Sequence, residues 1–197
     1  RFAVDSVLDG KIDIWNNTED TLASIANLLN KNGWVKDLDW GQEIITPPDF
    51  PCFFEGPDNN RKSSIWYESG VRKIKKVQST NFLKNTETSL LLPKGEYGPK
   101  FLVTKNFYTL KTYNNSDLYA LYVAHLSDLI DGKVQKFTAS WKDSPTLDKK
   151  SIFSLQKKLI KNGYNVGGYD GLIGHKTRRS LGLWQKKNGQ KITCFPN

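Results

Sequence analysis

The chain has 197 residues, of which 38% are hydrophobic and 12% aromatic, and this is enough apolar material for an ordinary packed core. At roughly 150 residues per domain, the length allows one or two domains. No apolar run approaches the ~20 residues that a membrane-spanning helix requires, so the sequence predicts no transmembrane segment.

The net charge of +9 is concentrated at the C-terminal end. Residues 149–197 contain 11 Lys and Arg but a single acid, Asp170, and therefore carry +10. Residues 1–148 contain 18 basic and 19 acidic residues, a net charge of −1. This asymmetry indicates two modules, of which the second meets an anionic partner. Nucleic acid, anionic lipid and a carboxylate-bearing wall polymer all satisfy that condition.

The chain begins at Arg1 and contains no Met, so we expect an N-terminal segment to precede it. A secretion signal is not visible in the first residues and would lie in that segment. Cys52 and Cys194 are far apart in the sequence, and two cysteines make neither a disulfide framework nor a metal cluster. The sequence favours two unpaired thiols over one bridge, and the distance in space decides between them. His125 and His175 lack the spacing of metal ligands.

Residues 5–16 predict a compact acidic loop, and a helix follows it. Thr18 suits the N-cap of that helix, with Asp20 in its first turn, and Gly33 suits a left-handed end after Asn32. The apolar positions recur at helical spacing: they are Leu22, Ile25, Ala26 and Leu29.

The middle of the chain is interrupted by prolines, which break regular structure. Two strands, 89–92 and 101–104, are predicted to form a hairpin joined through residues 93–98. Ser116 is predicted to cap a second helix, which ends at Gly132. Its expected apolar face consists of Tyr119, Tyr122, Val123, Leu126 and Ile130.

Residues 139–148 are the predicted linker to the basic segment. Two short helices are expected after it, the first ending at Gly163 and the second at Gly189, with a glycine-rich turn over 167–174 between them. The segment carries short motifs in a fixed order: Leu155-Gln156, Asn162-Gly163-Tyr164, Tyr169-Asp170-Gly171, Gly174, Thr177-Arg178 and Trp184-Gln185.

These motifs resemble the small three-helix peptidoglycan-binding domain of cell-wall hydrolases. The glycines would allow the tight turn between helices, and Asp170 would order that turn. The resemblance implies that the lysines and arginines face the carboxylates of the peptidoglycan stem peptides. This chain stops at Asn197, where the family continues into one more helix.

Three segments of the first two thirds, 2–16, 22–34 and 106–121, together resemble the membrane-bound lytic murein transglycosylase B family, over roughly residues 1–135. The resemblance implies an enzyme that cleaves the MurNAc–GlcNAc bond of peptidoglycan without water. One glutamate acts first as acid and then as base while the muramyl 6-hydroxyl closes an anhydro ring. This differs from the two-carboxylate arrangement of most glycosidases.

In that family the glutamate stands in a Glu-Ser/Thr-x-x-Gly motif, upstream of the segment where this chain begins. Glu68-Ser69-Gly70-Val71-Arg72 lacks the closing glycine, and we interpret Glu68 as an exposed loop residue. No catalytic residue is therefore assigned, and the chain by itself is expected to be inactive.

Tyr113, Asn114 and Tyr119 match the family's positions that line the substrate groove. Tyr hydroxyls and an Asn amide can bond sugar hydroxyls and an acetamido group, while the rings cover apolar sugar faces. The alternative is a simple helix start, with Asn114 or Ser116 as cap and Tyr119 in the core. Leu28 stands where many members have a further cleft tyrosine.

The acidic loop resembles a calcium loop of the EF-hand type, with Val7 and Asn16 in place of two usual oxygen donors. The resemblance implies a weak structural calcium held by Asp5, Asp9 and Asp20 with the Lys11 carbonyl and waters. The alternative is an Asp-Gly turn ordered by its own hydrogen bonds. No cofactor is otherwise required.

The expected fold is mainly α (α+β): a lysozyme-like catalytic-domain fragment over 1–138 with a small β element at 42–104, then the linker 139–148 and a three-helix domain over 149–197. We expect 149–197 to fold alone, whereas 1–135 leaves apolar helix faces exposed and is marginal. The expected partner is peptidoglycan, the chain is expected to be a monomer, and its location periplasmic or outer-membrane-associated.

Two other functions remain open at this point. The chain could belong to a non-catalytic wall-binding protein, which the upstream sequence would distinguish. A basic nucleic-acid binder fits the charge, but no helix-turn-helix or aromatic-basic strand pattern supports it.

Overall fold

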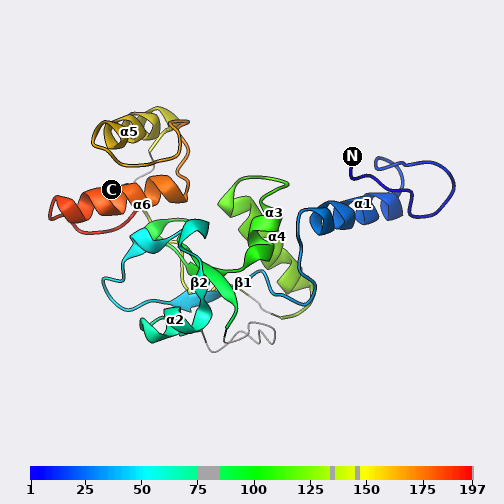
Figure 1. Cartoon of the computed structure of the whole chain (residues 1–197), viewed down its shortest axis with the longest axis horizontal. Helices are drawn as coiled ribbons and strands as arrows, with labels where there is room; N and C mark the ends of the chain where they lie inside the picture. The colour runs from blue at the N-terminus through cyan, green and yellow to red at the C-terminus, as the bar shows by residue number, and fades with distance from the viewer. Residues whose placement is uncertain (75–84, 134–135, 145–146, 197) are drawn as a thin grey trace.

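A computed structural model describes residues 1–74, 85–133, 136–144 and 147–196 of the chain. These residues form a central antiparallel sheet with helices on both faces, an N-terminal helical arm and a two-helix C-terminal unit (Figure 1). Within these ranges, every helix is too short or too polar to cross a membrane.

The sheet has five strands in the order β2-β4-β5-β1-β3, and all pairs are antiparallel. Strands β4 and β5 pair with Leu90 opposite Leu102, which confirms the predicted hairpin. The strands are β1 Gly41–Ile45, β2 Arg61–Lys62, β3 Arg72–Lys73, β4 Glu87–Leu91 and β5 Lys100–Val103.

Strands β4 and β5 bury both of their faces. Side chains alternate across a strand, so Leu90 and Leu102 lie in one hydrophobic cluster while Leu91 and Phe101 lie in another. This explains why the predicted strands contain consecutive apolar residues instead of an apolar–polar alternation. The sheet therefore separates two cores, each covered by different helices.

Helices α3 (Lys105–Leu110) and α4 (Asp117–Ile130) cover one core. The Ser116 hydroxyl caps α4, as predicted, by accepting a bond from the Tyr119 N–H. The predicted apolar face of α4 is wrong as a buried face, because Ala120, Leu121 and Ala124 contact the core instead. Helical periodicity identified one apolar stripe on α4, and the tertiary packing covers a neighbouring stripe with smaller side chains.

Helix α1 (Thr18–Lys31) extends away from the rest of the molecule as an arm (Figure 1). Its cap is Asn17, whose side chain accepts a bond from the Asp20 N–H, so the prediction of Thr18 as cap was wrong by one residue. Asp20 is the only buried residue of α1. Leu22 is 63% exposed and Ile25 is 47% exposed, so the expected exposed apolar face is present on this helix.

The second core is covered by short elements that the sequence pattern did not predict. They are the 3-10 helix η1 (Cys52–Phe54) and helix α2 (Ser63–Glu68). Two further 3-10 helices, η2 (Pro57–Asn59) and η3 (Gly95–Tyr97), lie in the connection after η1 and in the β4–β5 connection. Six residues or fewer are too few for an apolar repeat to stand out. The tertiary environment therefore determines them.

The C-terminal unit consists of α5 (Lys149–Lys161) and α6 (His175–Lys187), which pack around Leu159, Val166 and Leu181. Residues 147–196 contain these two helices, so the third helix of the expected domain is not present in that range. Both helices end where predicted, because Gly163 and Gly189 adopt positive φ angles after them. The part of the linker at 145–146 lies outside the described residues.

Cys52 and Cys194 form a disulfide, so the prediction of two unpaired thiols was wrong. The two residues are 142 positions apart in sequence, but their Cα atoms are 6.0 Å apart. Helix α6 passes directly over the bridge, because a Cβ atom on Gly182 would lie 2.2 Å from the Cys194 sulfur. The end of the chain is thus part of the core under the sheet, although the division into 1–138 and 149–197 remains a prediction.

Removing the disulfide by the double change Cys52→Ala and Cys194→Ala is expected to cost about 4–5 kcal/mol of unfolding free energy, because the bridge closes a very long loop in the unfolded chain. Urea denaturation of the variant and parent measures this loss. Reductant should destabilise the parent by the same amount and leave the variant unchanged. A loss below ~1 kcal/mol would contradict the structural role of the bridge.

Candidate functional site

The structure brings together the three residues predicted to line a substrate groove. Tyr113 and Asn114 lie in the turn between α3 and α4, and Tyr119 lies in the first turn of α4. The rings of Tyr113 and Tyr119 are stacked, with centroids 6.1 Å apart and an interplanar angle of 22°. Tyr113 is 65% exposed and Tyr119 is 37% exposed, so Tyr119 is not a core residue.

The turn that carries Tyr113 is held by local polar bonds. The Asn114 side-chain oxygen accepts from the Ser116 N–H at 3.0 Å, while Ser116 caps the helix. Lys111, before the turn, donates to Asp117 Oδ1, after it, at 2.6 Å. This ion pair joins the two ends of the turn and fixes the backbone on which the tyrosine stands.

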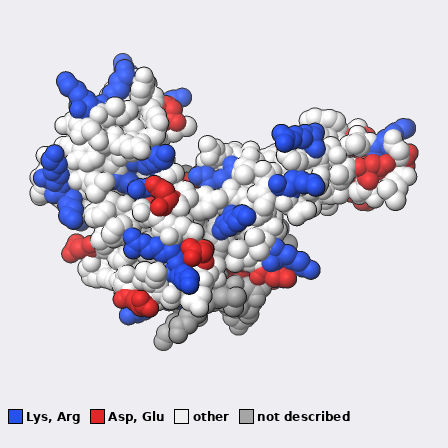
Figure 2. Space-filling view, in the orientation of Figure 1, with Lys and Arg blue, Asp and Glu red and all other residues white. Residues whose placement is uncertain are grey.

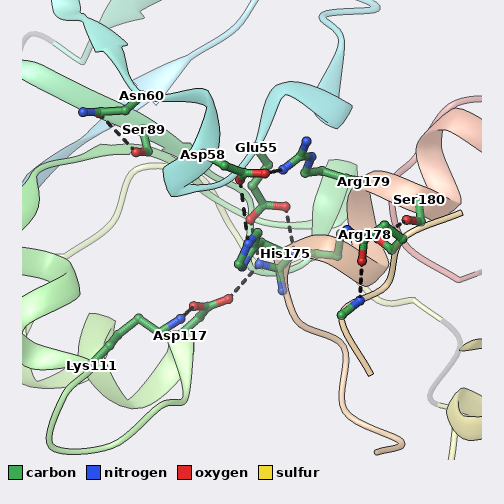
Figure 3. A network of polar contacts seen from close by, with 12 residues as sticks. Glu55, Asp58, Asn60, Ser89, Lys111, Asp117, His175, Arg178, Arg179 and Ser180 are labelled. Carbon is green, nitrogen blue, oxygen red and sulfur yellow. Dashed lines mark hydrogen bonds and ion pairs between the residues drawn. The ribbon is translucent and has the colours of Figure 1, made fainter. Parts of the chain in front are cut away.

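The other oxygen of Asp117 is bound by the C-terminal unit. Arg178 of α6 donates from Nη2 to Asp117 Oδ2 at 2.7 Å (Figure 3). The guanidinium and the Lys111 ammonium hold the pKa of Asp117 below its usual range, although burial opposes this shift. A residue of the C-terminal unit therefore contacts the first residue of α4 directly.

Arg178 is also bound by Glu55, which follows η1. Its Nη2 lies 2.6 Å from Glu55 Oε1, and its Nε lies 2.8 Å from Oε2. Glu55 is fully buried, and its Oε1 also accepts from the Leu92 N–H at 2.8 Å. Burial raises the pKa of Glu55, and the guanidinium of Arg178 opposes that shift. Because both oxygens accept bonds from Arg178, the geometry is that of an ionised carboxylate.

A second, more exposed set of contacts joins the same two parts of the chain. Asp58 of η2 forms an ion pair with Arg179 and lies 3.9 Å from His175 Nε2 (Figure 3). Burial and the positive charge of Arg178 together lower the pKa of His175 to about 4, although Asp117 and Asp58 oppose the shift. His175 is therefore neutral at physiological pH.

A cleft of about 740 Å³ lies beside this network, between the α3–α4 turn and the C-terminal unit. Asn114, Asn115 and Ser116 line one wall, and the glycine-rich segment 166–174 with the start of α6 lines the other. Figure 2 shows basic side chains distributed over the C-terminal unit and few acidic ones, in agreement with the charge pattern of the sequence.

Neither Glu68, which resembles part of the family's motif, nor the buried Glu55 is arranged as a catalytic acid. Glu68 is exposed, as predicted, but it is the last residue of α2 and not part of a loop. Glu55 is enclosed and is bound through both oxygens. No catalytic residue is assigned on this geometry.

The predicted calcium ligands are used in turns of the acidic loop. Asp5 accepts bonds from the N–H groups of Leu8, Asp9 and Gly10, and Asp9 accepts from Lys11. Asp20 accepts from Ser6 at 2.7 Å and from Asp13 at 2.9 Å. Among the described residues, no three carboxylate, His or Cys groups are placed to hold a metal ion. The side chains thus form the self-ordered turn, and calcium binding by Asp5, Asp9 and Asp20 remains a prediction.

Sequence reasoning missed Glu55, Asp117 and Lys111, and it noted Arg178 only as part of a motif. One signal was available: Glu55 follows the apolar run Cys52-Phe53-Phe54 and precedes Gly56-Pro57, so burial of its carboxylate could have been expected. A buried carboxylate requires a cation. The sequence does not indicate which of its 29 Lys and Arg supplies that cation.

Comparison with known proteins gives a match to one family and matches to several solved structures. A family model described as the transglycosylase SLT domain matches residues 1–128. SltB3 from Pseudomonas aeruginosa, solved with NAG-anhNAM-pentapeptide, is 34% identical with a TM-score of 0.85 over 100% of this chain. The same protein solved with NAG-NAM-pentapeptide gives 35% identity and a TM-score of 0.86, again over 100% of this chain.

The chain spans about half, 52%, of the SltB3 chain. The lytic transglycosylase Slt35 from Escherichia coli, solved in complex with calcium, is 25% identical with a TM-score of 0.50, and the match covers 68% of this chain and 41% of that one. No curated protein sequence matches the chain.

Replacing Arg178 by Met is expected to cost about 3–5 kcal/mol of unfolding free energy, because Glu55 then stays buried without its cation. Arg179→Met is the matched control on the same helix, and its partly exposed ion pair is worth less than ~1 kcal/mol. Urea denaturation compares the two. Equal losses would mean that the buried pair does not determine the packing of α6.

Stability is expected to fall as the pH decreases from about 6.5 to about 4, because the pKa of His175 is lowered in the folded state and the unfolded chain binds the proton first. His175→Gln should remove much of this slope. His125→Gln is the comparison variant and should remove a smaller part of the slope, because burial lowers the pKa of His125 but Asp128 and Glu43 oppose that shift. Thermal melting across this pH range measures the slopes, and an unchanged slope in His175→Gln would refute the assignment.

Proposed function

The chain belongs to the transglycosylase SLT domain family, and we propose that it is the distal part of an enzyme that cleaves the glycan strands of peptidoglycan. The observation that carries this proposal is the match of the whole chain to SltB3, a protein solved with a NAG-anhNAM-pentapeptide ligand. The reaction that we propose for the full-length protein is non-hydrolytic cleavage of the MurNAc–GlcNAc bond with release of anhydro-muropeptides.

In this proposal, the catalytic glutamate of that reaction lies outside this chain. Neither Glu55 nor Glu68 is arranged as a catalytic acid. The 197 residues alone bind substrate and do not turn it over. The parent protein acts in the bacterial cell envelope, in the periplasm or at the outer membrane, and this chain is a monomer.

Tyr113, Asn114 and Tyr119 contact the sugars in this proposal. The two rings are stacked, and both residues are exposed to solvent. Rings of this kind cover the apolar faces of sugars, and the neighbouring amide of Asn114 suits an acetamido group. The three residues come from one short stretch that polar bonds hold in place.

Residues 149–197 form the wall-binding part in the same proposal. Their +10 charge complements the carboxylates of stem peptides. A non-catalytic wall-binding protein is the second candidate, because the charge of residues 149–197 suits both functions equally. The sequence upstream of Arg1 distinguishes the two functions, because a Glu-Ser/Thr-x-x-Gly motif there belongs to the enzyme.

We expect the chain to co-sediment with purified peptidoglycan sacculi and to release no anhydro-muropeptides into the supernatant. Release would mean that a carboxylate of this chain is catalytic, and Glu68 would be mutated first. A chain that stays in the supernatant would refute the wall-binding function, and salt-dependent DNA binding would then be tested.

The sugar contacts are tested separately with a soluble chito-oligosaccharide in a titration. Tyr113→Ala and Tyr119→Ala should each weaken binding roughly two- to tenfold, which is the range that aromatic stacking supplies. Tyr122→Ala is the matched control, because Tyr122 lies on α4, is as exposed as Tyr113 and does not belong to the stacked pair. Equal losses in the three variants would argue against a site at Tyr113 and Tyr119.

A further inference from the structure

A second pocket, of about 290 Å³, lies between the proline-rich loop 47–51 and the neighbouring elements β2 and α2 (Figure 1). It shares no lining residue with the cleft beside the α3–α4 turn, and none of its lining residues belongs to the C-terminal unit. Its volume is close to the lower limit of about 300 Å³ for small-molecule sites. The pocket therefore has room for a ligand the size of a single amino acid.

Most of the lining is apolar and is held in place from behind. Phe50 and Phe54 pack against the core cluster that contains the fully buried Trp66, and the ring centroids of Phe50 and Trp66 are 6.4 Å apart. A Cβ atom on Gly70 would lie 2.7 Å from the Pro47 ring, so the loop rests tightly on the turn after α2. The walls are thus formed before any ligand binds. The apolar lining residues are Pro47, Pro48, Phe50, Pro51, Phe54 and Trp66.

A cation lies against these rings. The guanidinium carbon of Arg61 is 4.8 Å from the centroid of the Phe54 ring and 5.0 Å from that of Trp66. Arg61 lines the pocket and is half-buried, and no carboxylate of the described residues forms an ion pair with it. Stacking engages the faces of a guanidinium, whereas the N–H donors at its edge match the two oxygens of a carboxylate. The pocket thus presents an unpaired cation to a ligand.

An acidic group lines the same pocket. Asp49 is exposed, and its carboxylate forms no ion pair with Arg61 or with any other base of the described residues. Its φ angle of 57° lies in the left-handed region, which Asp tolerates better than most residues. Ser69, the remaining polar lining residue, donates its hydroxyl to the Ile65 carbonyl at 2.9 Å. The pocket therefore holds one unpaired positive group and one unpaired negative group beside apolar walls.

We propose that this pocket binds a free α-amino acid with an apolar side chain. Arg61 binds the carboxylate of the amino acid, Asp49 binds its ammonium group, and the side chain lies against the prolines and phenylalanines. A zwitterion complements both unpaired charges, whereas a purely anionic or purely cationic ligand would leave one of them without a partner. The site is built from residues other than those assigned to the glycan and the wall, so the inference does not rest on the proposed function.

Four probes test the three parts of the ligand separately: L-phenylalanine, its amide, N-acetyl-L-phenylalanine and glycine, each titrated against the parent chain by ligand-observed NMR. The amide lacks the carboxylate and should bind about tenfold more weakly than phenylalanine. The N-acetyl compound lacks the ammonium charge and should bind about threefold more weakly, because the exposed Asp49 is screened by water. Glycine lacks the apolar side chain and should bind at least about tenfold more weakly.

Variants assign each charge to its residue. Arg61→Met should bind phenylalanine no better than its amide, whereas Lys62→Met should behave as the parent, because adjacent side chains of a strand point to opposite faces and Lys62 does not line the pocket. Asp49→Asn should bind phenylalanine and its N-acetyl derivative equally, and Asn tolerates the same backbone angle. Asp37→Asn is its control, at another exposed position with a positive φ angle. Thermal melting verifies that each variant folds.

Equal affinity of the parent for phenylalanine, its amide and its N-acetyl derivative would overturn the inference, because the charges would then play no part. A loss in Lys62→Met as large as that in Arg61→Met would overturn it as well. If Arg61→Met does not fold, the comparison of phenylalanine with its amide in the parent decides the role of the cation without a variant. A parent that does not bind phenylalanine refutes the amino-acid site and leaves the proposed function standing, because sedimentation with sacculi tests that function independently.

Discussion

The ion pair between Glu55 and Arg178 is the constraint on which the arrangement of this molecule depends. Both side chains are buried, and a charge removed from water costs several kcal/mol unless a partner of opposite sign compensates it. Glu55 therefore requires α6 to lie against η1, and Arg178 requires α4 to begin beside it, where Asp117 supplies a second carboxylate. Three segments from different thirds of the chain meet at one guanidinium.

This constraint changes the interpretation of the charge pattern. The split between a neutral segment and a basic one suggested two modules joined by a linker, yet the basic segment is held by a buried ion pair and a disulfide. Gly182 allows α6 to approach the disulfide, since a side chain there would overlap the Cys194 sulfur. The C-terminal unit, attached in this way, keeps a fixed position next to the turn that carries Tyr113, so that one glycan strand engages both in the proposed function.

The N-terminal arm has the opposite character. Helix α1 has one buried residue, and its contacts with the loop before it are mainly hydrogen bonds, such as Asn27 to the Phe2 carbonyl. The connection to the body is made after the helix, where the buried Asn106 side chain bonds the backbone of Val35 and Leu38. Apolar side chains that stay exposed on α1 give this helix little packing stability of its own.

The sequence by itself determined the features that depend on neighbouring residues: the β4–β5 hairpin, the Ser116 cap and the glycine ends of the C-terminal helices. Its motifs also indicated a lytic transglycosylase, which the family match supports. The tertiary structure alone decided the disulfide, the buried face of α4 and the cleft, and it showed that the aspartates of the acidic loop bind backbone N–H groups. Glu55 and Arg178 are 123 residues apart, and no local pattern indicates that one needs the other. Turns and caps follow from short-range bonds and backbone angles, whereas a buried charge finds its partner only when the chain has folded.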